Sequence, residues 1–161
     1  MTEQQAQGVV AIADISNTGL LNNLAGEFSG NLLCFKEYLG LSTQASEAAL
    51  IQLQDEPDAQ PCTGHAPYST HPNLLRALKT RAKRLGHTFP IHTAESFAEI
   101  ELLRTGGGEM RTFLEERGFW DGSFQPSGKH GGAVTYLQQH GLLDSKTLCV
   151  HCVYLTEEEI A

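Results

Sequence analysis

Three histidines and one glutamate stand where an α/β protein usually carries its chemistry. His65, His92 and His151 each follow or end a short apolar run, and Glu95 lies three residues after His92 in an H-x-x-E. Functional side chains of parallel α/β folds gather at the carboxyl ends of the strands, so we expect the three imidazoles at one edge of the sheet. Histidines at such an edge can converge on a divalent metal, and a nearby carboxylate can move a proton of the water that the metal activates.

Each of these residues also has a simpler interpretation. A single histidine at a strand end is more often a hydrogen-bonded polar residue than a ligand. Glu95 can serve merely as a negative charge at the start of the next helix. Three histidines at the ends of three strands make coincidence the weaker explanation, so we predict a functional site at this edge.

Five apolar segments predict the strands that position this site. They are residues 8–15, 32–38, 62–65, 88–94 and 147–155. Helical periodicity between them predicts helices over 46–54, 74–85, about 97–104, 110–117 and 133–140, and a further helix starts near 156. Strands that alternate with helices and are apolar on both faces indicate a parallel sheet covered by helices. This α/β pattern fits a complete small doubly wound sheet or part of a larger barrel, and periodicity does not choose between them.

Composition excludes several classes of function. The 161 residues contain 11 Lys and Arg against 19 Asp and Glu, which gives a net charge of -8. A chain of this charge is a poor partner for phosphate backbones, so we do not expect it to bind nucleic acid. No apolar run approaches a membrane span and the first residues form no secretory signal, so we expect a cytoplasmic protein.

Cys149 and Cys152 form a C-x-x-C within the last predicted strand. Positions of odd separation on a strand face opposite ways, so these two thiols would not converge. The pattern therefore favours small apolar side chains over a redox pair or a zinc knuckle.

Three segments carry a resemblance to a known superfamily. They are Gly-His-Ala-Pro-Tyr-Ser at 64–69, Ile-His-Thr-Ala-Glu-Ser at 91–96 with Glu99, and Val-His-Cys-Val at 150–153 with Leu155 and Thr156. As a set they resemble the amidohydrolase superfamily, in its cytosine deaminase and chlorohydrolase-like branch. The resemblance implies a partial (β/α)8 TIM barrel of about five parallel βα units. The three segments look like the ends of strands four, five and six of that barrel, and residues 8–16 and 35–40 are similar to strands two and three.

The resemblance also implies roles for the site residues. His92 matches the metal ligand of strand five, and Glu95 matches the carboxylate that carries a proton from the activated water to a ring nitrogen of the substrate. His151 matches the strand-six histidine, which ligates the metal or holds the attacking water. His65 matches a residue that contacts the substrate, and we group Tyr68 with it. The implied reaction is hydrolytic removal of an amino or chloro group from an amidine-like ring carbon, with zinc or iron as the implied cofactor.

The sequence departs from the superfamily pattern in two places. It contains no H-x-H, which the first strand of the family supplies, and the last motif is followed by no strand carrying the family's metal-binding Asp. We therefore expect residues 1–161 to be the central part of a catalytic barrel that lacks strands one, seven and eight. A catalytic zinc normally has three protein ligands, so we expect this chain to bind metal weakly and to be inactive in isolation. A second copy would cover the edges that an open half-barrel exposes.

Three functions remain open at this point. The first is part of a deaminase of a purine-like or nucleoside-like substrate, because residues 101–108 and 113–118 resemble segments of adenosine-type and aminofutalosine-type deaminases. Arg104 and Arg111 in this region could reach a polar tail of the substrate, although solvated helix charges are the favoured interpretation. The second is a non-catalytic half-barrel that binds or assembles. The third is a flavodoxin-like nucleotide-binding domain, for which residues 16–19 are only a faint phosphate loop.

Overall fold

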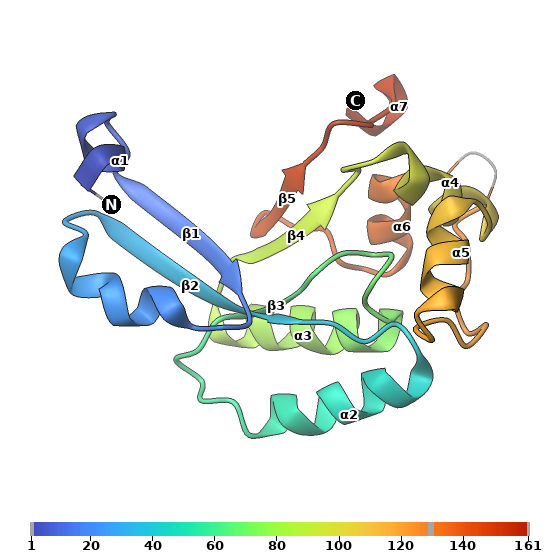
Figure 1. Ribbon diagram of the computed structural model, residues 1–161, viewed down its shortest axis with the longest axis horizontal. Helices are drawn as coiled ribbons and strands as arrows, with labels where there is room; N and C mark the ends of the chain where they lie inside the picture. The colour runs from blue at the N-terminus through green and yellow to red at the C-terminus, as the bar shows by residue number, and fades with distance from the viewer. Residues whose placement is uncertain (1, 129–130, 161) are drawn as a thin grey trace.

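Five short parallel strands lie at the centre of the computed structural model, which describes residues 2–128 and 131–160 (Figure 1). The strands are β1 (Ala11–Ser16), β2 (Asn31–Tyr38), β3 (Cys62–Gly64), β4 (Phe89–Thr93) and β5 (Thr147–His151). The first three pair in the order β1-β2-β3, and β4 pairs with β5. Every pairing is parallel, so the carboxyl ends of neighbouring strands meet at one edge.

A short seam joins the two sheets between β3 and β4. The backbone amide of His92 donates a hydrogen bond of 3.0 Å to the carbonyl of His65. The hydroxyl of Thr63 donates to the carbonyl of Pro90. The five strands thus follow one another in chain order across the molecule, as the βα pattern predicts.

Helices connect the strands, and α2 and α3 lie together on one side of them (Figure 1). They are α1 (Thr2–Ala6), the 3-10 helix η1 (Leu20–Glu27), α2 (Thr43–Gln54), α3 (Pro72–Leu85), α4 (Phe97–Thr105), α5 (Glu109–Glu116), α6 (Ala133–Gln139) and α7 (Glu157–Ile160). The hydroxyls of Ser42 and Ser96 cap the first turns of α2 and α4. None of the described helices is both long and apolar enough to span a bilayer.

The main core lies between α3 and the sheet. Leu74, Leu75 and Leu78 are fully buried there, together with Phe89 and Ile91 of β4. Gly64 allows α3 to approach closely, because a Cβ atom at this position would lie 2.5 Å from Leu75 Cδ2. A second core cluster under α4, α5 and α6 includes Leu102, Leu103 and Tyr136.

A buried ion pair ties α3 to the start of β5. Lys79 is only 3% exposed, and its Nζ lies 2.7 Å from Asp144 Oδ1 and 2.6 Å from Thr147 Oγ1. The hydroxyl of Thr147 in turn donates to the carbonyl of Leu142. The ammonium is therefore both paired and hydrogen-bonded, which is the condition under which a buried charge is tolerated.

The observed elements follow the predicted ones closely, with three differences. The last strand ends at His151 and not at residue 155, because the backbone becomes left-handed at His151 and Cys152, with φ values of 74° and 55°, and the chain leaves the extended conformation there. The helices α1 and η1 were not predicted. The described part of the chain is a mixed α/β fold with parallel strands, as expected.

Candidate metal-dependent active site

Three imidazole rings lie in a row across the carboxyl ends of β3, β4 and β5. His65 follows the last residue of β3, His92 is the fourth residue of β4, and His151 ends β5. The ring centroids of His65 and His92 are 4.9 Å apart, and those of His92 and His151 are 5.2 Å apart. The structure thus brings together the three histidines that the strand-end argument selected.

Glu95 joins the row at its His151 end. Its Oε1 lies 3.5 Å from His151 Nε2, and its side chain is 44% exposed. The carboxylate is therefore near the histidines and open to a small molecule.

The backbone is left-handed at the ends of β4 and β5, next to Glu95 and at His151, and this conformation orients both side chains. Ala94, His151 and Cys152 have φ values of 53°, 74° and 55°, a conformation that costs non-glycine residues about 1–3 kcal/mol each. Backbone hydrogen bonds hold it in place, from Cys152 to the carbonyl of Thr93 and from Val153 to that of Ala94. Such strain, maintained by surrounding hydrogen bonds, is typical of functional sites.

Glu99, on the first turn of α4, fixes the loop that carries Glu95. It is fully buried and accepts hydrogen bonds from the backbone amides of Ala94 and Glu95 at 3.0 and 2.8 Å. Burial raises the pKa of Glu99, and the bonds from backbone amides oppose that rise. Glu99 thus contacts the backbone of the site and not its open side.

His65 is held by its own loop. Its Nδ1 lies 2.6 Å from the hydroxyl of Ser69, and the ring of Tyr68 meets it edge-on at 5.6 Å. Burial and the neighbouring His92 lower the pKa of His65, which favours the neutral imidazole. Burial and Glu95 raise the pKa of Tyr68 to about 12, so its hydroxyl keeps its proton at neutral pH.

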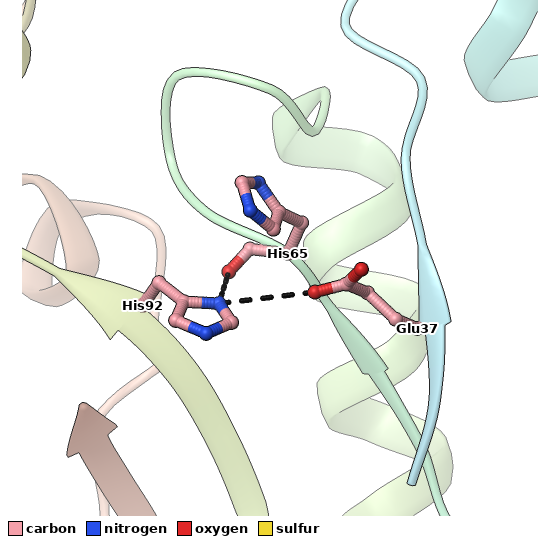
Figure 2. Close-up of side chains that lie close together, drawn as sticks. All are labelled: Glu37, His65 and His92. Atoms are coloured by element: carbon pink, nitrogen blue, oxygen red, sulfur yellow. Dashed lines mark hydrogen bonds and ion pairs between the residues drawn. The ribbon is translucent and has the colours of Figure 1, made fainter. Parts of the chain in front are cut away.

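Glu37 is a site residue that the sequence analysis did not select. It is the last residue but one of β2, and its Oε1 lies 3.8 Å from His92 Nδ1 (Figure 2). Burial raises the pKa of this carboxyl, and His92 opposes the rise. Like the three histidines, Glu37 stands at the carboxyl end of a parallel strand, and this position is the signal in the sequence that points to it.

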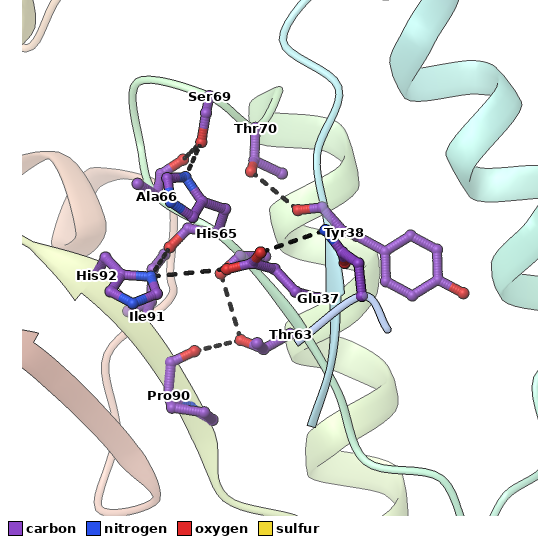
Figure 3. Close-up of polar contacts among 12 residues, drawn as sticks. Glu37, Tyr38, Thr63, His65, Ala66, Ser69, Thr70, Pro90, Ile91 and His92 are labelled. Atoms are coloured by element: carbon purple, nitrogen blue, oxygen red, sulfur yellow. Dashed lines mark hydrogen bonds and ion pairs between the residues drawn. The ribbon is translucent and has the colours of Figure 1, made fainter. Parts of the chain in front are cut away.

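These donors suit a divalent cation. Glu37, His65 and His92 each offer one ligand atom within 4.8 Å of the others. Figure 3 shows His92 Nδ1 facing the carbonyl of His65, at 2.9 Å. A carbonyl only accepts, so Nδ1 carries the proton and Nε2 keeps its lone pair. This is the arrangement that orients histidine ligands in metal sites.

The two arginines considered as substrate contacts are engaged within the protein. Arg104 Nε donates to the carbonyl of Gly131 at 2.8 Å. Arg111 Nε lies 2.9 Å from Glu115 Oε1, one helical turn further along α5. Their contacts agree with the favoured interpretation as helix charges.

Known proteins resemble this chain in sequence and in fold. No protein-family model matches it. It is 32% identical over 95 residues to 5-methylthioadenosine/S-adenosylhomocysteine deaminase of Aquifex aeolicus, which covers 59% of this chain and 17% of that protein. The crystal structure of Helicobacter pylori aminofutalosine deaminase in complex with methylthio-coformycin superposes with a TM-score of 0.72 at 26% identity. That match covers 99% of this chain and 40% of the other.

A second solved structure extends the likeness in fold. The adenosine deaminase of Xanthomonas campestris with bound zinc superposes with a TM-score of 0.63 at 16% identity, over 98% of this chain and 34% of that one. These structural neighbours are TIM barrels, and this chain covers only part of them. The predicted partial barrel is thereby confirmed.

Proposed function

We propose that this chain, whose homologues are deaminases of the amidohydrolase superfamily, forms the central part of the catalytic barrel of a metal-dependent deaminase. Its substrate is a nucleoside-like or purine-like ring, and water replaces the amino group of one ring carbon. The observation that carries the proposal is the row of His65, His92 and His151 at adjacent strand ends, with Glu95 beside it.

His92 and His151 would hold the metal in this proposal, with zinc or iron as the candidates. The lone pair on His92 Nε2 supports its assignment. His151 Nε2 instead faces Glu95, so this histidine either ligates the metal or holds the attacking water. When bound, the metal would bring the pKa of a water ligand close to neutrality.

Glu95 moves the proton in this scheme. Its exposed carboxylate can take a proton from the attacking water and deliver it to a ring nitrogen of the substrate. Water then adds to the ring carbon, the second proton of that water passes to the amino nitrogen, the carbon–nitrogen bond breaks, and ammonia leaves. Glu99 keeps the carboxylate in position, since it holds the backbone amide of Glu95.

His65 and Tyr68 contact the substrate in this scheme. The lowered pKa of His65 keeps it neutral, with its ring held by the hydroxyl of Ser69. The raised pKa of Tyr68 keeps its hydroxyl a hydrogen-bond donor. Both lie on the side of His92 opposite to His151, so a ring lying over His92 would meet them.

The remaining parts of the proposal concern partners and location. Large apolar side chains are exposed on β2 and in the segment after β5, among them Leu33 and Val153. We propose that a second copy of the chain covers such faces, and that the protein works in the cytoplasm on a small molecule and not on nucleic acid.

Metal binding tests the ligand assignment. Zinc titrations of the wild-type chain, His92→Asn, His151→Asn and Glu37→Gln should show weak binding that both histidine variants reduce further. A loss in Glu37→Gln without a loss in His151→Asn would contradict the assignment and favour the group of Glu37, His65 and His92.

Binding of methylthio-coformycin to the zinc-treated chain tests the reaction class. We expect binding that needs zinc, is lost in Glu95→Gln and is kept in Glu47→Gln, a matched change on the exposed face of α2. Absence of any zinc-dependent binding would favour the non-catalytic half-barrel instead.

A further inference from the structure

Two histidines outside the proposed site lie at the amino-terminal end of α3. His71 is the N-cap residue of this helix, and its Nδ1 accepts a hydrogen bond of 3.1 Å from the backbone amide of Asn73. His140 directly follows α6, and its Nδ1 lies 2.9 Å from Nη1 of Arg76. The other terminal nitrogen of Arg76 donates to Oδ1 of Asn73 at 2.6 Å, so the two contacts are linked within α3. The end of α6 is thereby joined to the start of α3.

The direction of these hydrogen bonds fixes the charge of both rings. A backbone amide and a guanidinium can only donate, so Nδ1 of His71 and Nδ1 of His140 both accept and carry no proton. The single proton of each ring is therefore on Nε2. A second proton would have to occupy Nδ1, where it removes the lone pair that makes the contact. Both contacts exist only while the imidazoles are neutral.

The groups that face His140 favour the neutral ring. It faces the guanidinium of Arg76 and the ring of His71, and it packs against the ring of Tyr136 at a centroid distance of 4.4 Å. Burial, Arg76 and His71 lower the pKa of His140 from its ordinary value of 6.5. A protonated His140 would therefore be repelled by the arginine that bonds to the neutral ring.

His71 faces a second partner, the carboxylate of Asp121 in the loop after α5. Burial lowers the pKa of His71, Asp121 opposes this effect, and Arg76 adds to it. The hydroxyl of Ser123 and the backbone amide of Thr43 donate to Asp121 and hold the pKa of its carboxyl well below the usual range. Asp121 is therefore an anion at every pH at which His71 titrates. A protonated His71 could no longer cap α3 and would be drawn toward this anion.

The start of α3 is also bonded to the loop that carries His65. The backbone amide of His71 donates to the carbonyl of Gly40 at 2.9 Å, and the amide of Gly40 donates to the carbonyl of Ser69 at 3.0 Å. The hydroxyl of Ser69 in turn lies 2.6 Å from Nδ1 of His65. These contacts connect the N-cap of α3 to the ring of His65.

We propose that His71 and His140 form a pH-sensitive latch, which fixes the start of α3 and the loop before it only while both rings are neutral. In acid, each ring takes a proton on Nδ1, His71 turns from the amide of Asn73 to Asp121, and His140 separates from Arg76. Since the folded protein prefers the neutral rings, their contribution to stability is complete well above pH 6.5 and is lost as the pH falls below it. This inference concerns the fold and does not depend on the deaminase proposal.

Amide hydrogen exchange at about pH 7.5 and about pH 5.5 tests the latch. Protection factors remove the intrinsic pH dependence of exchange, so they report only the opening of the structure. We expect the protection of the amides of Gly40, His71 and Asn73 to fall at the lower pH, by up to about tenfold for each histidine. Protection that is the same at both pH values would overturn the inference.

A double variant, His71→Asn with His140→Asn, assigns the effect. Asparagine offers an uncharged acceptor oxygen in place of each Nδ1 and is a good N-cap residue, so protection at about pH 7.5 should be kept and most of the fall should disappear. His65 is unchanged in this variant, so any fall that remains belongs to its own titration. His87→Asn, just beyond the other end of α3, is the matched control and should behave as the wild type. An equal fall in the wild type and the double variant would overturn the inference, and a fall removed by either single substitution alone would contradict joint action.

NMR titration of the ring signals keeps the inference testable if the double variant does not fold. In the wild-type chain, His71 and His140 should both titrate below pH 6.5. Arg76→Gln removes the facing charge but keeps a side-chain donor, so the midpoint of His140 should move upward. Titration of either ring at or above pH 6.5 in the wild type, or an unchanged midpoint of His140 in Arg76→Gln, would contradict the latch.

Discussion

Two carboxylates four residues apart differ in their surroundings and therefore in what they can do. The side chain of Glu95 is 44% exposed beside His151, whereas Glu99 is fully buried against backbone amides. An exposed carboxylate can exchange protons with a substrate. A buried one with its oxygens occupied can only position its neighbours.

Glu95→Gln should change ligand binding without changing the fold. We expect its free energy of unfolding to stay within about 0.5 kcal/mol of the wild type, as for other exposed substitutions. Urea denaturation checks this value beside the methylthio-coformycin titration. A large loss of stability would mean that Glu95 supports the structure instead.

Glu99→Gln should show the opposite behaviour. An amide offers one acceptor oxygen where the carboxylate accepts from both Ala94 and Glu95, so one buried amide loses its partner. We expect a loss of about 1–3 kcal/mol in urea denaturation, against less than about 0.5 kcal/mol for Glu47→Gln. A loss as small as that of the control would remove the positioning role of Glu99.

The sequence could predict which residues lie at the site but not the role of each one. His65, His92 and His151 were found because each stands at the end of an apolar run. Glu95 and Glu99 both follow the same strand, and only burial, which depends on how α4 packs, tells them apart. Glu37 also stands at a strand end, but it belongs to no motif in the sequence, and only the fold brings it within 3.8 Å of His92.

At the scale of elements, the ion pair between Lys79 and Asp144 holds α3 against the start of β5, the strand that ends in His151. Lys79 on α3 contacts Asp144 and Thr147 across the core. The hydrogen bond from Lys79 lowers the pKa of Asp144 to about 2, below its usual value of 3.8. Since the folded protein prefers the ionised form, this contribution to stability is complete above about pH 4 and is lost as the pH falls toward 2.

Asp144→Asn should therefore lower stability at neutral pH and reduce its dependence on acid. Removing one partner leaves the ammonium of Lys79 buried and poorly compensated, so we expect a loss of about 2 kcal/mol at about pH 7. Urea denaturation at about pH 7 and about pH 3 measures both effects. Asp58→Asn, which breaks the exposed contact with Arg84, is the matched control and should cost less than about 0.5 kcal/mol. Equal losses in the two variants would contradict this account.

The order of strands and helices followed from the sequence, whereas the exact ends of the strands did not. Apolar runs bounded by glycine and proline located all five strands. The predicted end of the last strand, at residue 155, was wrong because nothing in the sequence pattern indicates left-handed backbone at His151 and Cys152. The seam between β3 and β4 is a tertiary contact, and no local pattern reports it.

At the scale of the whole molecule, the five parallel strands leave apolar side chains uncovered. Leu33, Leu148 and Val153 are each about half exposed or more. The solved structure from Helicobacter pylori superposes on 99% of this chain but extends well beyond it, since the match covers 40% of that structure. In the described part of this chain, these side chains face solvent, and we propose that exposed apolar residues of this size contact a second copy.

Self-association should therefore increase with concentration. Light scattering over a range of protein concentrations should show the mass rising toward that of a dimer. Leu33→Ser combined with Val153→Ser should shift the transition to higher concentration, and Ile51→Ser should not. A monodisperse monomer at every concentration would contradict the proposal.

The backbone carbonyl of His65 takes part both in the proposed metal site and in the contact between the two sheets. The carbonyl of His65 accepts hydrogen bonds from both the backbone amide and Nδ1 of His92. The proposed metal ligand therefore also stabilises the seam between the two sheets. In the proposed enzyme, the requirement for metal binding and the requirement for folding would therefore act on the same side chain. A relative that lost the proposed activity would still be expected to keep this histidine, whereas Glu95, whose exposed side chain pairs only with His151 among the described residues, at 3.5 Å, would be expected to vary.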